Sequence, residues 1–203
     1  MKLYDGGRAP NPRRVRIFLA EKGISVPLVP VDIMKGEHKT PAFTSLNPMQ
    51  RIPSLVLDDG TVISESIAIC RYFEALQPEP ALFGRGPAGC ALVEMWQRRM
   101  ELDLLLAVAA VFRHTHPSMV TLEAQQVAEW GEANRSRVAS FLTFLDGHLE
   151  GREFVAGDEF SVADITGLVA VDFMRLPRIP VPEGLANVKR WHGALAARPS
   201  AKA

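Results

Sequence analysis

The chain has 203 residues, of which 47% are hydrophobic and 23% are charged, a composition typical of globular proteins. Its 23 Lys and Arg residues balance 23 Asp and Glu residues, so charge gives no reason to expect a nucleic acid or an anionic membrane as a partner. The two cysteines form no disulfide framework, and the N-terminus lacks the apolar core of a signal peptide. The longest apolar run, 104–112, is too short to cross a bilayer. We therefore expect a cytoplasmic protein with no membrane segment.

The first thirty residues predict a strand, a helix and a second strand. Residues 2–4 form a short opening strand, and a glycine-containing loop follows it. Asn11 and Pro12 are then the expected N-cap and first helical residue, and Gly23 is the expected stop. Residues 26–31 predict the second strand, which completes a βαβ unit. The polar segment after it contains one short helix near 41–45.

Residues 47–76 predict a hairpin followed by a helix. Residues 54–57 are rich in strand formers, 58–60 form a turn, 61–63 return, and the helix starts at Ser64 or just after it. Pro53 stands at the strand entrance, where a trans bond would simply open the strand. A cis bond would instead turn the backbone N–H and C=O of Ile52 outward, free for a ligand.

The helix that follows the hairpin begins with Ser64, Glu65 and Ser66. One interpretation is ordinary helix capping by Ser64 with an acidic first turn. The other is an anion site, because the unpaired N–H groups and positive dipole of a helix N-terminus favour a carboxylate. In that case the Ser66 hydroxyl adds a donor, and Glu65 holds a nearby ammonium group.

The Pro- and Gly-rich segment 79–89 is the expected linker between a first domain, 1–78, and a second, 90–203. The second domain predicts helices only, at 91–113, 121–149 and 185–197, with one more after the capping box of Ser161 and Asp164. No phosphate-binding glycine loop or serine nucleophile elbow is present. His114 and His116 do not share a helix face, so no metal site is expected.

Two strings of the first domain carry a family resemblance. The run NPMQRIPSLVLDDG followed by SESIAICRYFEAL resembles the glutathione-binding core of the cytosolic glutathione transferases, bacterial members in particular. The SVAD string at 161–164 is similar to the capping box of their helical domain. The resemblance implies an α/β plus all-α protein, with a thioredoxin-like domain in β-α-β-α-β-β-α order followed by a helical bundle. It also implies a homodimer.

The resemblance further implies where the ligands bind. Glutathione would be held by residues of the first domain, namely His38, Lys39, Gln50, Arg51, Ile52, Pro53, Glu65 and Ser66. Taken alone, His38 and Lys39 would be solvated surface residues. A hydrophobic electrophile would lie between the domains, against candidates on the first long helix of the second domain: Leu104, Val108, Val111 and Phe112.

The first loop departs from the family pattern. These enzymes place Tyr, Ser or Cys there to stabilise the thiolate, but residues 6–15 contain none of these. Where many bacterial relatives have Ser-Pro-Asn, this chain has Ala9, Pro10 and Asn11, which leaves the Asn11 amide as the remaining side-chain donor. The leading hypothesis is a detoxifying glutathione transferase that conjugates glutathione to small hydrophobic electrophiles, or a reductive or isomerising variant. The alternative is a non-catalytic member that binds glutathione or a protein partner.

Overall fold

The computed structural model describes residues 1–203, and the chain divides into two compact units. One unit comprises Met1–Leu82 together with the C-terminal Pro199–Ala203, and the other comprises Phe83–Arg198. The expected linker, 79–89, spans this division, and a helix already begins inside it at Gly86. The last five residues were expected in the helical domain but belong to the first unit. There the Ala201 carbonyl accepts from Arg13, and the Ser200 hydroxyl donates to Glu21.

The first unit is a four-stranded sheet with helices packed on it. The strands are β1 (Lys2–Asp5), β2 (Leu28–Pro30), β3 (Ser54–Val56) and β4 (Val62–Ser64), in the order β2-β1-β3-β4. β1 pairs parallel with β2 and antiparallel with β3, and β3 pairs antiparallel with β4. The helices are α1 (Pro10–Lys22), α2 (Pro41–Leu46) and α3 (Ser66–Leu76), with a 3₁₀ turn η1 (Glu37–Lys39) before α2. The β-α-β-α-β-β-α prediction is confirmed.

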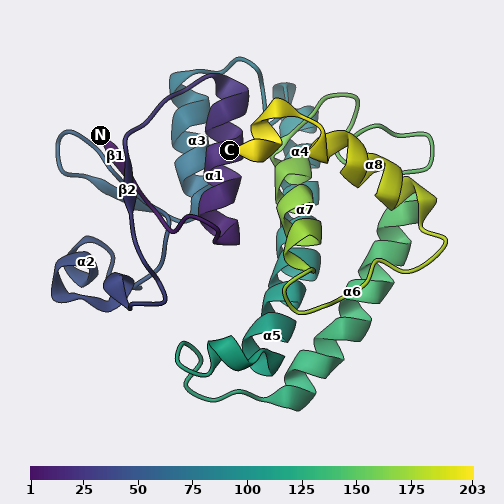
Figure 1. Cartoon of the computed structure of the whole chain (residues 1–203). Helices are drawn as coiled ribbons and strands as arrows, with labels where there is room; N and C mark the ends of the chain where they lie inside the picture. The colour runs from purple at the N-terminus through teal and green to yellow at the C-terminus, as the bar shows by residue number, and fades with distance from the viewer. The chain divides into compact units, whose positions relative to one another are not determined.

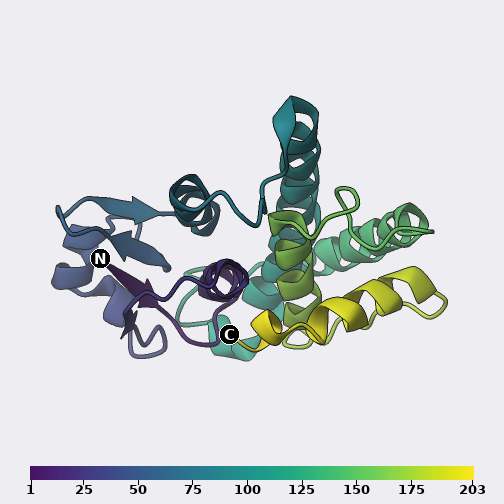
Figure 2. The same ribbon diagram turned by 90° about the horizontal axis from the view of Figure 1, so that it is seen from above.

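The core of this unit lies between the sheet and the helices α1 and α3, which run side by side in Figures 1 and 2. Leu3 and Leu55 from the sheet are completely buried, as are Phe18 of α1 and Ile69 of α3. Burying one such side chain stabilises the fold by about 1.5–3 kcal/mol. The hydrophobic spacing seen in the sequence therefore fixes which faces of α1 and α3 meet.

The start of α1 differs from the sequence prediction. The helix begins at Pro10, its N-cap is Ala9, and Arg13 donates its backbone N–H to the Ala9 carbonyl. Asn11 is therefore not the N-cap but the second helical residue. The physical reason is that both Pro10 and Pro12 fit the first turn, where backbone N–H groups have no helical partner. The end at Gly23, in the left-handed conformation, is as predicted.

The second unit consists of helices. A single long helical segment joins α4 (Gly86–Arg99), the π-helical turn η2 (Met100–Leu105) and α5 (Leu106–Thr115). A 3₁₀ turn η3 (Pro117–Met119), α6 (Ala128–His148), α7 (Val162–Phe173) and α8 (Ala186–Ala196) follow. The final 3₁₀ turn, η4 (Pro199–Lys202), belongs to the first unit. No helix of the structure is both long and apolar enough to cross a membrane.

The predicted helix 121–149 starts seven residues late, at Ala128. Residues before it fold back on the end of α5 instead. Gln126 donates through Nε2 to the carbonyls of Arg113 and His116 at 2.8 and 2.9 Å, and Val127 N–H donates to His114 Nδ1. The bond to Arg113 satisfies a carbonyl that the C-terminus of α5 leaves unpaired, and the His116 carbonyl also accepts from Met119 N–H.

Helix α7 is the centre of the second unit, and residues 162–171 of it are all buried. It packs on α4 and on α8 (Figure 1). Gly167 allows the close approach to α8, because a Cβ there would lie 2.5 Å from a ring carbon of Trp191. The buried Asp164, in the first turn of this helix, accepts four hydrogen bonds: from the N–H groups of Val155 and Ser161, the Ser161 hydroxyl and the Trp191 indole.

The predicted capping box of Ser161 and Asp164 is present, and Asp164 also ties α8 to α7. We expect Asp164→Ala to lower the free energy of unfolding by about 3 kcal/mol or more, because four donors lose their acceptor in the core. Urea denaturation measures this loss. The control is Asp158→Ala, which removes an exposed carboxylate from the same loop.

Burial raises the pKa of the Asp164 carboxyl to about 6, although the Trp191 indole and the other donors act against it. Because the folded pKa lies above the ordinary value of 3.8, this group favours the folded state most at low pH, and that contribution is lost as pH rises through about 6. The stability of the wild type relative to Asp164→Asn should therefore fall between about pH 4 and pH 7. A relative stability that grows over this range would contradict the raised pKa.

Candidate functional site

In the first unit, strand pairing brings the start of β3 and the ends of β1 and β4 to the same edge of the sheet. Ser54 of β3 lies opposite Tyr4 of β1 and opposite Ser64 of β4. Because β3 is antiparallel to both neighbours, its beginning meets the ends of β1 and β4. The first loop, the segment before β3 and the start of α3 therefore share one edge of the sheet.

The segment before β3 carries the bond between Ile52 and Pro53, which is cis. Ile52 makes no hydrogen bond within the protein through its backbone N–H or C=O. The outward-facing backbone expected for the cis alternative is thus available to a ligand. Gly6 of the first loop packs against the same residue, since a Cβ on Gly6 would lie 1.9 Å from Ile52 Cδ1. A larger residue at position 6 would have to displace the Ile52 side chain, so glycine favours this contact between the first loop and the cis-proline segment.

Asn47 holds the cis-proline segment in place. Its buried side chain donates through Nδ2 to the Arg51 carbonyl at 2.8 Å and to Ser54 Oγ at 3.2 Å, and it accepts from Met49 N–H at 3.1 Å. Asn47 is the first residue of the run that carries the family resemblance, but its sequence pattern predicts no role for its side chain. A buried amide with both ends bonded fixes the loop on each side of Arg51.

The N-terminus of α3 is open to a ligand. Glu65 is its exposed N-cap residue, with φ of 67°, and its side chain caps nothing. Ser66 is the first helical residue and is buried, and its hydroxyl has no partner within the protein. A non-glycine residue held at positive φ costs of order 1–3 kcal/mol and occurs often at ligand sites. The capping interpretation does not describe this turn, because Ser64 ends β4 rather than capping α3.

Three cationic or imidazole groups gather on the neighbouring loops. His38 is buried in η1, and its Nδ1 atom has no hydrogen-bond partner. Burial lowers the pKa of His38, and the nearby charges of Lys39 and Arg51 lower it further. Lys39 and Arg51 are both exposed. Gln50 lies beside them with φ of 53° and donates to Thr44 Oγ1 at 3.0 Å. This cluster suits an anionic group of a ligand.

The N-terminal turn of α1 follows the first loop. Asp5, at the end of β1, accepts from Gly7 N–H at 2.9 Å and pairs with Arg16 of α1, whose Nη2 donates to the Gly7 carbonyl at 2.7 Å. These bonds fix the loop between β1 and α1. Asn11 is exposed in the first helical turn, and its Oδ1 accepts from Arg14 Nη2 at 2.8 Å.

Three of the four residues of the helical unit that were expected to contact an electrophile are buried instead. Leu104, Val108 and Val111 have no exposed surface, so they present no atoms to a ligand in this structure. Phe112 is partly exposed, and its ring contacts Phe173 at 5.3 Å and His116 at 4.9 Å between centroids. Periodicity alone could not separate the buried face of this helix from a lining face, because both are apolar. The structure contains no group of three or more side chains arranged to hold a metal.

A thioredoxin-like unit with a cis-proline segment, followed by a helical unit, is the two-domain class of fold that the sequence resemblance implied. Residues 9–76 match the family model described as glutathione S-transferase, N-terminal domain, and residues 96–199 match glutathione S-transferase, C-terminal domain. The chain belongs to the glutathione S-transferase family and is an enzyme of that family.

Several relatives match over nearly the whole chain. Glutathione S-transferase 2 of Saccharomyces cerevisiae is 39% identical over all of this chain and 88% of its own length, and glutathione S-transferase 3 of Zea mays is 34% identical over 98% and 90%. The crystal structure of Gtt2 from Saccharomyces cerevisiae has a TM-score of 0.95, covering 100% of this chain and 99% of that one. A glutathione S-transferase domain-containing protein of Marinobacter aquaeolei is 41% identical, with a TM-score of 0.95 over 98% and 99%.

We expect Asn47→Ala to weaken glutathione binding by about three- to tenfold, the equivalent of one lost hydrogen bond, because Arg51 and Ile52 lose their support. Isothermal titration with glutathione measures the change. The matched control is Asn134→Ala, which removes an equally buried asparagine from the helical unit and should lower stability without weakening glutathione binding. Equal losses of affinity in both variants would mean that Asn47 acts only through stability.

Proposed function

We propose that this protein conjugates glutathione to small hydrophobic electrophiles. The observation that supports the proposal most is the convergence of unpartnered polar groups at one sheet edge: the Ser66 hydroxyl, the Ile52 backbone and the His38 imidazole. In the reaction, the glutathione thiolate forms a bond to an electrophilic carbon, whose leaving group departs with its electron pair, and the thiol proton passes to solvent.

In this proposal each end of glutathione meets a complementary group. Glutathione has an amino-acid head with both charges at one end and a glycine carboxylate at the other. The head group fits the α3 N-terminus, where Ser66 and helix N–H groups meet its carboxylate and Glu65 meets its ammonium. The Ile52 backbone pairs with the middle of the peptide, next to Pro53. The glycine carboxylate lies against the cluster of His38, Lys39, Gln50 and Arg51.

The proposed reaction requires that the protein lower the pKa of the glutathione thiol. A thiol with a pKa near 8.5 is mostly protonated at neutral pH, and lowering that pKa by about two units requires about 2.7 kcal/mol of selective thiolate stabilisation. Ala9 offers only a methyl group at the position where the resemblance places a serine in many bacterial relatives. We assign the stabilisation to the N-terminal turn of α1 and to Asn11, whose Nδ2 has no partner within the protein.

We further propose that Phe112 contributes the electrophile contact of the helical unit, because it is the member of the predicted set with exposed surface. Its contacts with Phe173 and His116 give that surface an aromatic character suited to flat hydrophobic molecules. Conjugation of such molecules is a detoxification reaction. A cytoplasmic location fits the exposed free thiol of Cys90, since disulfides form in oxidising compartments.

A pH titration of thiolate absorbance for glutathione bound to the purified protein tests the proposal. We expect a midpoint well below that of free glutathione. Ala9→Ser should lower the midpoint further and raise the conjugation rate with a chromogenic electrophile, because it restores a hydroxyl beside the thiol. Bound glutathione with an unshifted midpoint would favour the alternative function, a non-catalytic glutathione-binding protein. Failure to bind glutathione would refute the roles of Glu65 and Ser66.

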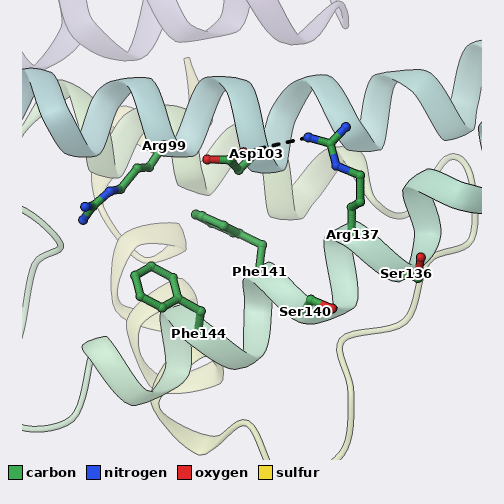
Figure 3. Close-up of a pocket in the computed structure, with 7 residues that line it drawn as sticks. All are labelled: Arg99, Asp103, Ser136, Arg137, Ser140, Phe141 and Phe144. Carbon is green, nitrogen blue, oxygen red and sulfur yellow. Dashed lines mark ion pairs between the residues drawn. The ribbon is translucent and has the colours of Figure 1, made fainter.

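We also propose a homodimer, formed through one face of the helical unit. Leu92, Met95, Leu102 and Leu106 recur along the segment from α4 to α5, and each is between 37% and 52% exposed. Beside this stripe lies a pocket between that segment and α6, where Phe141 and Phe144 lie among Arg99, Asp103 and Arg137 (Figure 3). Exposed apolar area of this kind marks an interaction surface. The face carries both charge signs, and Asp103 pairs with Arg137 at 3.8 Å, so no field of a single sign opposes the approach of a second copy.

Leu102→Glu should convert the dimer to a monomer, because it places a charge in the apolar contact while leaving the buried core unchanged. Sedimentation equilibrium or light scattering measures the mass. Leu176→Glu, at another residue that is 45% exposed, is the matched control and should leave the mass unchanged. A wild-type protein that is monomeric at micromolar concentration would refute this interface.

A further inference from the structure

The N-terminal turn of α1 has few backbone donors. The first and third helical residues are Pro10 and Pro12, which have no N–H, and Arg13 N–H already donates to the Ala9 carbonyl. Only the Asn11 N–H remains free in this turn. A typical helix N-terminus offers several unpaired N–H groups to an anion. A thiolate held here therefore depends more than usual on a side-chain donor.

The orientation of the Asn11 amide is settled by its partner. Arg14 Nη2 lies 2.8 Å from Asn11 Oδ1. A guanidinium only donates hydrogen bonds, so the atom facing it must be the amide oxygen. The NH₂ group of Asn11 consequently faces away from Arg14, on an exposed side chain, and has no partner within the protein. The same bond removes the competing arrangement in which the amide oxygen faces an incoming anion.

We propose that Arg14 is a positioning residue for thiol activation: its buried guanidinium holds the Asn11 amide with the NH₂ group turned outward and polarises it as a donor. The inference rests on the proposed function. A charge-assisted bond to the amide oxygen withdraws electron density from the nitrogen and strengthens its N–H groups as donors. Arg14 thus acts through Asn11 and does not itself touch the sulfur.

The surroundings of Arg14 favour a fixed geometry. Arg14 is only 3% exposed, although it lies one turn from the open end of α1. Burial raises the pKa of the Cys70 thiol of α3, and the nearby charge of Arg14 acts against this rise. Arg14 therefore lies at the packed boundary between α1 and α3. A guanidinium held in this way loses little further freedom when it fixes the amide. An exposed arginine would release the amide during thermal motion.

Thiolate titrations of bound glutathione in a small set of variants test the inference. Asn11→Ala removes the donor and should raise the titration midpoint by about one pH unit, a tenfold loss of thiolate at low pH. Arg14→Met should raise the midpoint by a similar amount, because the freed amide can rotate its oxygen toward the sulfur. The double variant should match Asn11→Ala, since Arg14 acts only through that amide. Glutathione affinity should change little, because α3 and the cationic cluster remain.

Two further variants separate orientation from charge. Arg14→Gln keeps an NH₂ donor for the Asn11 oxygen without the charge, and should recover part of the lost shift. Arg13→Met removes an equal charge from the neighbouring residue, which bonds to Ala201 rather than to Asn11, and should leave the midpoint unchanged. If Arg14→Met fails to fold, Arg14→Ala carries the comparison. In the ¹⁵N-labelled wild type, the Asn11 NH₂ resonances, assigned by their loss in Asn11→Ala, should shift when glutathione binds.

The outcomes are distinct. A wild-type midpoint in folded Arg14→Met or Arg14→Ala, with a raised midpoint in Asn11→Ala, would overturn the role of Arg14 and leave Asn11 as donor. A double variant whose shift is the sum of the two single shifts would mean that Arg14 acts directly through its charge, which also overturns the inference. Asn11 NH₂ resonances that do not shift when glutathione binds would also overturn the inference. An unshifted midpoint in the wild type would instead refute the proposed function.

Discussion

The pairing of β3 between β1 and β4 is the constraint on which the candidate site depends. Because β3 is antiparallel to both strands, its first residue adjoins the last residues of its neighbours. A slip of one residue would turn the side chains of β3 to the opposite face and shift the cis-proline segment relative to the first loop and the start of α3. The complete burial of Leu55 against the helices makes such a slip costly, so the packing of the core also fixes the geometry of the site.

Two physical demands compete at the start of α1. A helix benefits from proline in its first turn, where N–H groups lack partners and the fixed φ angle is already helical. Anion stabilisation needs those same N–H groups. With Pro10 and Pro12 both in this turn, the helix start is rigid but poor in donors. The pairing of Arg14 with Asn11 returns one oriented donor to the turn, at the cost of burying a charge.

The helical unit combines a rigid centre with an apolar outer face. Asp164 joins the loop before α7, the helix itself and α8 through four donors, so the buried α7 holds its neighbours in register. The long segment α4–η2–α5 turns its buried face toward α7 and leaves leucine and methionine side chains exposed on the other face. This division explains why three of the four apolar residues singled out on that segment belong to the core.

The order of strands and helices and the capping box could be predicted from the sequence, because turn residues and hydrophobic periodicity are local signals. The sequence could not determine where α1 and α6 begin, since two prolines each suit a first turn and residues 121–127 pair with the end of α5 instead of coiling. The cis bond, the contacts of Asn47 and the orientation of the Asn11 amide are visible only in the tertiary structure. Each of these depends on partners brought close by folding, and pattern along the chain does not record which side chains will meet.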